Sequence, residues 1–168
     1  GYTLSGQDHP VFADLSFTAP GDGWAVTAAF ALGNESLPGR APTSTVLHYD
    51  GTQWTPLPGG AISLPSAAYS VAHLVMRTAH DGWGILAPAV LPNQSRNYTK
   101  EPGYLLHDRN GTWQVVQTPP GIAFTTIAMH TATDGWALGI HATPNGAADV
   151  NQPIVLLQYQ AGTWQIVG

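Results

Sequence analysis

Hydrophobic residues recur at every second position in short stretches of the chain. Large apolar side chains stand at positions 15 and 17, at 74 and 76, and at 127 and 129. A period of two predicts β-strands, because successive side chains of a strand point to opposite faces of the sheet. The stretches are short and are bounded by Gly, Pro, Asn and Asp, which disfavours helices. We therefore expect an all-β fold.

The strand pattern returns three times along the chain. Three of the six tryptophans follow Asp-Gly directly, and the other three come just after a Gly-Thr turn. The two tryptophans of a unit are 30 residues apart in the first and second units and 28 apart in the third. The triplets span 22–24, 81–83 and 134–136, and the later tryptophans are Trp54, Trp113 and Trp164. Four-stranded antiparallel units with a period of about 50–60 residues are typical of propeller blades.

Each unit is expected to hold four strands within a single domain, residues 1–168. The expected strands are 15–18, 24–30, 45–49 and 54–57, then 74–77, 83–87, 104–107 and 113–116, then 127–130, 136–140, 155–159 and 164–167. The blades then cover about 11–58, 69–118 and 122–168. Asp-Gly should form the first hairpin turn of each blade, and Asp-Gly, Asn-Gly or Ala-Gly the third, because these residues tolerate positive φ. Both kinds of turn should lie at one end of the blades, with the long polar loops at the other.

The motifs resemble those of bacterial β-propeller repeats of the kelch and Asp-box type. The likeness rests on Asp-Gly-Trp-Ala at the start of one strand and on Leu-His-Tyr-Asp-Gly-Thr-Gln-Trp at 47–54. The chain is also similar to photosystem II assembly-factor propellers, in which a Gly-Trp-Ala strand recurs. It lacks the full Asp-box spacing and the double glycine of a kelch repeat. The resemblance implies a propeller fold but no single activity, since propellers host enzymes, lectins and scaffolds.

Three blades do not close a ring, because propellers typically have about four to eight. An open stack leaves an apolar sheet face uncovered at each end. Two arrangements would cover these faces. Two chains would pair as a homodimer with six blades, or the chain would be a fragment of a longer propeller.

Composition narrows the classes of partner. The 168 residues include 5 Lys+Arg and 10 Asp+Glu, which gives a formal net charge of −5. So few cations exclude a nucleic-acid partner as a leading hypothesis. No run of apolar residues reaches the roughly 18 that a membrane-spanning helix needs, so we expect no direct membrane insertion. Cysteine is absent, which removes disulfides, thiolate metal sites and cysteine nucleophiles.

The repeated aspartates and tryptophans are expected to be structural. An aspartate before glycine can bond the amides of its own turn, and each tryptophan should fill the space between blades. These residues are Asp22, Trp24, Trp54, Asp81, Trp83, Trp113, Asp134, Trp136 and Trp164. His48 and His107 match across two blades, with Gln158 in the third, which favours a structural hydrogen bond over a metal site. We expect no metal and no cofactor.

Positions that differ between blades are better candidates for binding a ligand. Thr18, Arg77 and His130 each stand four residues before a repeated aspartate, where they would line the mouth of the central channel. Arg40, Arg96 and Tyr98 lie in the long polar loops, the part of a rigid scaffold where binding is often found.

These features favour a non-enzymatic binding or interaction module that acts outside the cytoplasm and binds a glycan or a protein. One alternative is a sialidase-like glycoside hydrolase. That reaction needs paired carboxylates or a tyrosine nucleophile and an arginine cluster, and the chain has only four arginines and two glutamates. Another alternative is the sensor ectodomain of a larger membrane-anchored protein. A signal or anchor is not expected within this chain.

Overall fold

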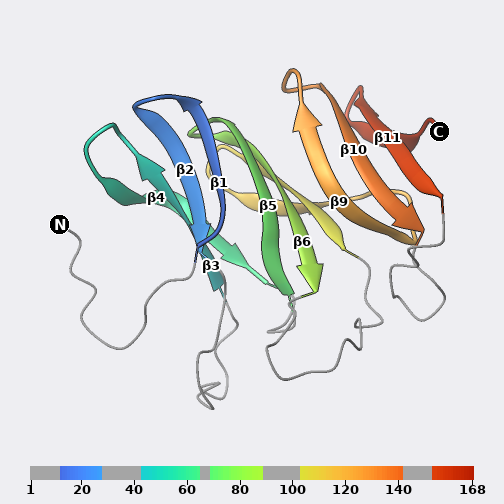
Figure 1. Cartoon of the computed structure of the whole chain (residues 1–168), viewed down its shortest axis with the longest axis horizontal. Coiled ribbons are helices and arrows are strands. Elements are labelled where there is room, and N and C mark those ends of the chain that lie inside the picture. The colour runs from blue at the N-terminus through green and yellow to red at the C-terminus, as the bar shows by residue number, and fades with distance from the viewer. Residues whose placement is uncertain (1–11, 28–42, 65–68, 89–102, 142–152) are drawn as a thin grey trace, which may run out of the picture.

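The computed structural model describes residues 12–27, 43–64, 69–88, 103–141 and 153–168, and these form three four-stranded antiparallel sheets (Figure 1). The first sheet holds β1 (Phe12–Ala19), β2 (Asp22–Thr27), β3 (Thr43–Tyr49) and β4 (Trp54–Ser63). The second holds β5 (Tyr69–Thr78), β6 (Asp81–Pro88), β7 (Tyr104–Arg109) and β8 (Trp113–Val116). The third holds β9 (Ile122–Met129), β10 (Asp134–His141), β11 (Ile154–Gln160) and β12 (Thr163–Ile166). The all-β prediction of three propeller-like blades is confirmed.

The sheets stack side by side in chain order, and within each sheet the strands also follow chain order (Figure 1). Their first strands, β1, β5 and β9, lie next to one another at the front of Figure 1. Strand order and stacking therefore make β1, β5 and β9 the inner strands of the stack. No helix in the described ranges is long and apolar enough to cross a membrane.

Two apolar clusters hold the three sheets together. The first lies between the first and second sheets, where Trp24 and Val26 of β2 pack with Leu74 of β5. The second lies between the second and third sheets, where Trp83 of β6 packs with Ile127 and Trp164. Burial of these side chains is the main stabilising contribution to such a stack.

How far each tryptophan is buried depends on whether another sheet lies against its face of the blade. Trp24, Trp83 and Trp164 are buried between neighbouring sheets, and Trp113 is partly buried against the first cluster, as expected for residues between blades. Trp54 is also partly buried, but its ring packs on Phe17 and Tyr49 of its own sheet. Trp136 instead is 40 % exposed. It lies on the face of the third sheet that no other described sheet covers. Within a single chain, Trp54 and Trp136 therefore do not lie between two blades, unlike the other four tryptophans.

The Asp-Gly pairs do not form the first turn of each blade, which corrects the sequence prediction. Asp22, Asp81 and Asp134 begin the strands β2, β6 and β10, and the glycine after each belongs to the strand. None of these three glycines has a positive φ. Each instead lies under a side chain of the neighbouring strand: a Cβ at Gly23, Gly82 or Gly135 would meet the ring of Phe17, the Sδ of Met76 or the Sδ of Met129, and that side chain would have to move.

The third turns of the blades do have positive φ. Asn110 and Gly111 have φ of 56° and 80°, and Ala161 and Gly162 have φ of 52° and 86°. In the second sheet the two kinds of turn are joined, because the amide of Asn110 donates to the carbonyl of His80 at 3.1 Å. The turns therefore share one end of the blades, as predicted.

Strand β4 is longer than the sequence pattern predicts, reaching Ser63 instead of residue 57. Pro56 and Pro58 lie within it. Proline has no amide hydrogen to donate, but β4 is an outer strand of its sheet, where one side of the strand has no partner. Leu57 and Ile62 carry β4 into the first apolar cluster.

Ala161→Asn should raise the free energy of unfolding by up to about 1 kcal/mol, because alanine is disfavoured at positive φ and asparagine tolerates it. Asn110 already takes this place in the second sheet. Urea unfolding followed by circular dichroism measures the change. Ala132→Asn is the matched control, because Ala132 is also an exposed turn residue but has no positive φ. Equal stabilities for Ala161→Asn and the parent protein would contradict the prediction.

Candidate functional site

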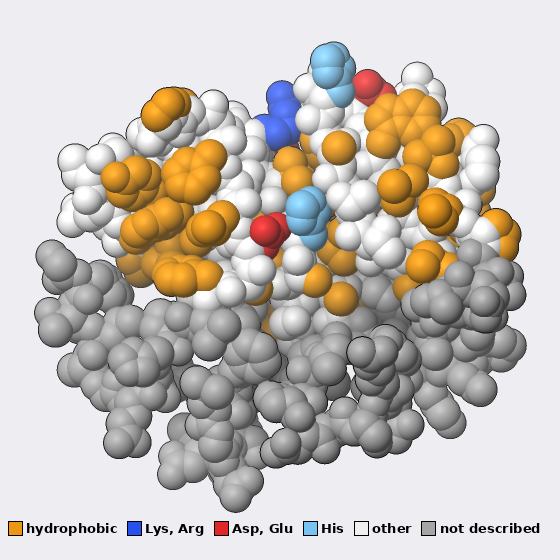
Figure 2. Space-filling model, in the orientation of Figure 1, with side chains coloured by type: hydrophobic (Ala, Val, Ile, Leu, Met, Phe, Trp, Pro, Cys, Tyr) orange, Lys and Arg blue, Asp and Glu red, His pale blue; other side chains and the backbone are white. Residues whose placement is uncertain are grey.

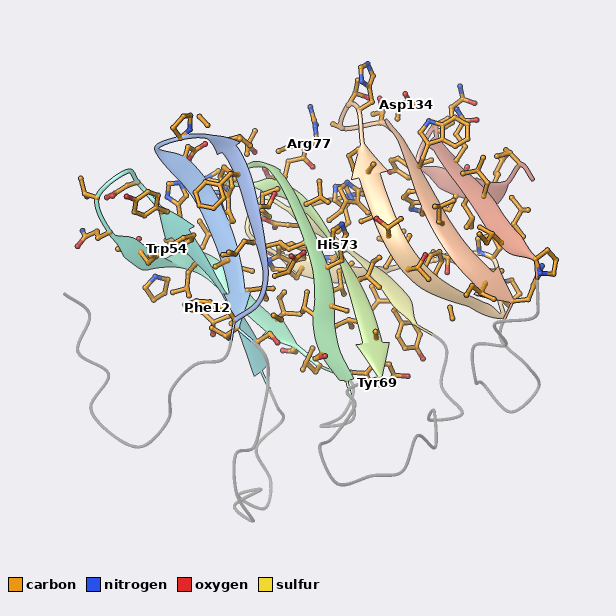
Figure 3. The ribbon with its side chains drawn as sticks, viewed as in Figure 1. Phe12, Trp54, Tyr69, His73, Arg77 and Asp134 are labelled. Atoms are coloured by element: carbon orange, nitrogen blue, oxygen red, sulfur yellow. The ribbon has the colours of Figure 1, made fainter. Side chains whose placement is uncertain are left out.

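The rim of the blade stack is the candidate site. It lies where β1, β5 and β9 end and β2, β6 and β10 begin, at the top of Figure 3. Arg77 and Asp134 are both found along this rim (Figure 3). An antiparallel hairpin brings the end of one strand beside the start of the next. The predicted ligand positions and the repeated aspartates are therefore neighbours within each blade.

In the first blade the rim aspartate joins two other strands. Asp22 accepts a hydrogen bond from the Thr18 hydroxyl at Oδ2, at 2.6 Å. Its Oδ1 lies 2.7 Å from Nε2 of His48 on β3. The hydrogen bonds from His48 and Thr18 lower the pKa of Asp22 below its usual value. The carboxylate thus connects β1 to β3 across the start of β2.

The second blade repeats this arrangement with an arginine. Arg77 Nη1 donates to Oδ2 of Asp81 at 2.6 Å, and Asp81 Oδ1 lies 3.2 Å from Nε2 of His107. The other ring nitrogen of His107, Nδ1, accepts from Nε of Arg109 at 3.1 Å. Arginine is always a donor, so His107 is neutral and carries its proton on Nε2. Burial lowers the pKa of His107, which agrees with the neutral ring.

The third blade keeps the aspartate but not its partners. Gln158 takes the place of the histidine, opposite Trp136 on the neighbouring strand. No side-chain hydrogen bond of Asp134 or His130 is found within the described part of the third sheet. The ring of His130 is exposed. The aspartate and the strand pairing are the same in all three blades, but the polar side chains next to the aspartate at the rim differ from blade to blade.

The expected role of the aspartates needs correction. The sequence predicts that each bonds the amides of its own turn, whereas Asp22 and Asp81 bond side chains of the first and third strands of their sheets. The turn-bonding role belongs to Asp50, whose Oδ1 accepts from the amides of Thr52 and Gln53, both at 2.9 Å. Hydrogen bonds from the Thr52 hydroxyl and from these amides lower the pKa of Asp50 to about 2.

Sequence reasoning also missed a contact between blades. Asp14 of β1 lies 2.9 Å from Nδ1 of His73 on β5, and its Oδ2 accepts from the amide of Leu74 at 2.7 Å. The amide of Met76 donates to the Ser16 hydroxyl at 3.2 Å. His73 appears on the front of β5 in Figure 3. These bonds fasten the inner strands of the first two sheets to each other.

Equal spacing in the sequence indicates the aspartate–histidine pairs at the rim. Asp22 and His48 are 26 residues apart, and so are Asp81 and His107. The inner-strand pair of Asp14 and His73 has no such signal, because its members belong to different repeats.

The structure brings Thr18 and Arg77 to equivalent places beside their aspartates, and it places His130 at the same end of the third sheet, directly after β9. Arg40, Arg96 and Tyr98 lie outside the described residues. His, Asp and Glu form no group of three or more that would suit a metal ion in the described ranges.

No protein-family model matches the chain, and no curated protein matches it. The likeness to kelch and Asp-box blades therefore remains a resemblance of motifs.

Proposed function

We propose that the chain is a non-enzymatic binding module of propeller blades, which acts outside the cytoplasm and binds its ligand at the rim. The observation that carries this proposal is the contrast between framework and rim. The aspartate, glycine and tryptophan at the start of β2, β6 and β10 are the same in every blade. The side chain beside the aspartate is threonine, arginine or histidine. A constant frame with varied contact positions suits recognition.

Arg77 is the strongest candidate for direct contact with a ligand. Asp81 holds the guanidinium through Nη1 alone, and the Arg77 side chain is 30 % exposed. Its other nitrogens have no hydrogen-bond partner in the described ranges. A guanidinium that is fixed on one side and open on the other suits a carboxylate or sulfate group of a glycan or protein ligand.

The acid–base side chains of the rim support binding over catalysis. Asp22 and Asp81 are engaged by histidines of their own sheets, and His107 is held neutral between Asp81 and Arg109. These contacts fasten strands together. They use the polar atoms that a general acid or base would offer to a substrate.

An array of neutral, sialylated and sulfated glycans tests the proposal. We expect retention of glycans with an acidic group, with binding reduced at least about tenfold by Arg77→Ala, the loss expected for one charge-assisted contact. His130→Ala should weaken binding less. Both variants should keep their stability within about 1 kcal/mol, because neither side chain is in the core.

Unchanged glycan binding by both variants would contradict a ligand site at the rim. Release of sugar from a retained glycan would contradict the non-enzymatic part of the proposal.

A further inference from the structure

The junction between the second and third sheets shows how one blade packs on the next. Trp83 of β6 is fully buried there. Its ring meets Tyr159 and Trp164 of the third sheet nearly edge-on, with centroid distances of 4.8 and 5.6 Å. Tyr159 and Trp164 face each other across β11 and β12 and form a tilted pair. The junction is thus one tryptophan set against a tyrosine–tryptophan pair.

The third sheet ends with the first half of such a junction. Trp136 stands two residues after the start of β10, as Trp83 does in β6, and it pairs with Gln158 where Trp83 pairs with His107. It therefore points away from the second sheet. Trp136 is 40 % exposed, whereas Trp83 is 0 % exposed.

The first sheet begins with the other half. Tyr49 and Trp54 face each other across β3 and β4, with ring centroids 5.2 Å apart and planes at 34°. The buried pair of Tyr159 and Trp164 has 5.1 Å and 35°. The aromatic pair at the open face thus has the same geometry as the pair that receives Trp83. No ring from a preceding sheet packs on it in the described residues.

Phe17 extends this open face. It pairs with Gly23 on the neighbouring strand, as Met129 pairs with Gly135 in the third sheet. Met129 packs in the same apolar cluster as Trp83. Phe17 is 53 % exposed and lies edge-on to both Tyr49 and Trp54.

Exposed apolar side chains gather at the two ends of the stack. Seven of the eight large ones in the described ranges lie in the first or third sheet or directly beside it, and Val115 alone belongs to the second. Figure 2 shows apolar side chains gathered over the first sheet and again over the third. Exposed patches of this kind mark interaction surfaces.

We propose that two copies of this chain pair head to tail, so that Trp136 of each copy packs on the face of Phe17, Tyr49 and Trp54 of the other. The proposal rests on continuity with the junction already present inside the chain, which has the same tryptophan and tyrosine–tryptophan pair at the same register positions. Two such contacts close a ring of six blades, within the range of about four to eight known for propellers. A contact between two different faces rotates each copy relative to the one before it. It gives a closed ring instead of an open filament when these rotations add up to a full turn, here after two copies.

Light scattering of the whole chain over a range of concentrations is the first test. We expect a mass of twice 17.7 kDa, constant with concentration. A mass of one chain at every concentration would overturn the proposal, and so would a mass that keeps growing, since the contacts would then form open filaments.

Charged substitutions decide which faces meet. Trp136→Glu and Phe17→Arg should each give a single-chain mass, because each places a charge in both contacts of the dimer. The matched control is Val115→Glu, which alters an exposed apolar side chain of the second sheet and should leave the dimer intact. Loss of the dimer in this control would overturn the assignment of the faces.

Mixing the two variants gives the sharpest result. Head-to-tail pairing predicts a dimer in the mixture, since one contact regains its native residues and the other brings the introduced carboxylate against the introduced guanidinium. A mixture that stays at the single-chain mass would overturn the proposal. So would either variant forming a dimer alone, which would mean that like faces pair.

Two further measurements keep the outcomes distinct. Circular dichroism spectra like that of the parent protein confirm that the variants are folded. Glycan binding is measured separately from the mass, so the dimer proposal and the proposed function fail independently.

Discussion

Trp83→Ala should lower the free energy of unfolding by about 3–5 kcal/mol, the loss typical for a large buried aromatic side chain. The Trp83 ring is stacked on His107 with ring centroids 3.9 Å apart, and it also meets Tyr159 and Trp164. Truncation would leave a cavity at the junction between two sheets. Urea unfolding followed by circular dichroism measures the loss.

Two variants isolate the cause of this loss. The indole N–H of Trp83 has no acceptor in the described residues, so Trp83→Phe keeps most of the packing and should cost clearly less than Trp83→Ala. Trp136→Ala removes the same side chain from an exposed position and should cost under about 1 kcal/mol in the single-chain state, which is obtained by comparing the variants in protein that also carries Phe17→Arg. Equal losses for Trp83→Ala and Trp136→Ala in that state would contradict the buried junction.

Asp81→Ala should destabilise the protein by about 2 kcal/mol, because it leaves the buried N–H of His107 without an acceptor. The side chain of His107 is only 8 % exposed, and Asp81 also holds Arg77 at 2.6 Å. Both contacts depend on one carboxylate. Thermal unfolding at neutral pH, where His107 is neutral, measures the loss.

Asp134→Ala is the matched control for Asp81→Ala. Asp134 has the same place at the start of β10 but no side-chain hydrogen bond within the described residues. Its removal should change the stability by less than about 0.5 kcal/mol. A loss as large as that of Asp81→Ala would show that the aspartate acts through its position at the strand start instead of through its partners.

The strands were predictable because alternation is a local property of the sequence. Leu74 and Met76 stand two positions apart and both face the first sheet, as their spacing predicts. The first turn of each blade was not predictable in the same way. Asp-Gly is a strong turn signal, but here the glycine serves the packing of a methionine or phenylalanine from the neighbouring strand. The residue types near a turn do not show whether a glycine is there for its positive φ or for the close approach of a side chain from the neighbouring strand.

The candidate site was only partly predictable for a related reason. Thr18, Arg77 and His130 follow from their equal spacing to the aspartates, since position along a hairpin fixes which end of the sheet they reach. The contact of Asp14 with His73 depends on how two sheets stack, which spacing within one repeat does not determine. Trp136 likewise follows the same Asp-Gly pair as Trp83, and its exposure depends on whether another sheet follows.

The hydrogen bonds from β5 to the first sheet affect aggregation as well as stacking. β5 is an edge strand, and a free edge recruits foreign strands into fibrils. The amides of Leu74 and Met76 are already taken by Asp14 and Ser16, so an incoming strand cannot use these two donors. Two small polar side chains of one blade thereby shield the next from the cross-β assembly to which an all-strand protein is prone.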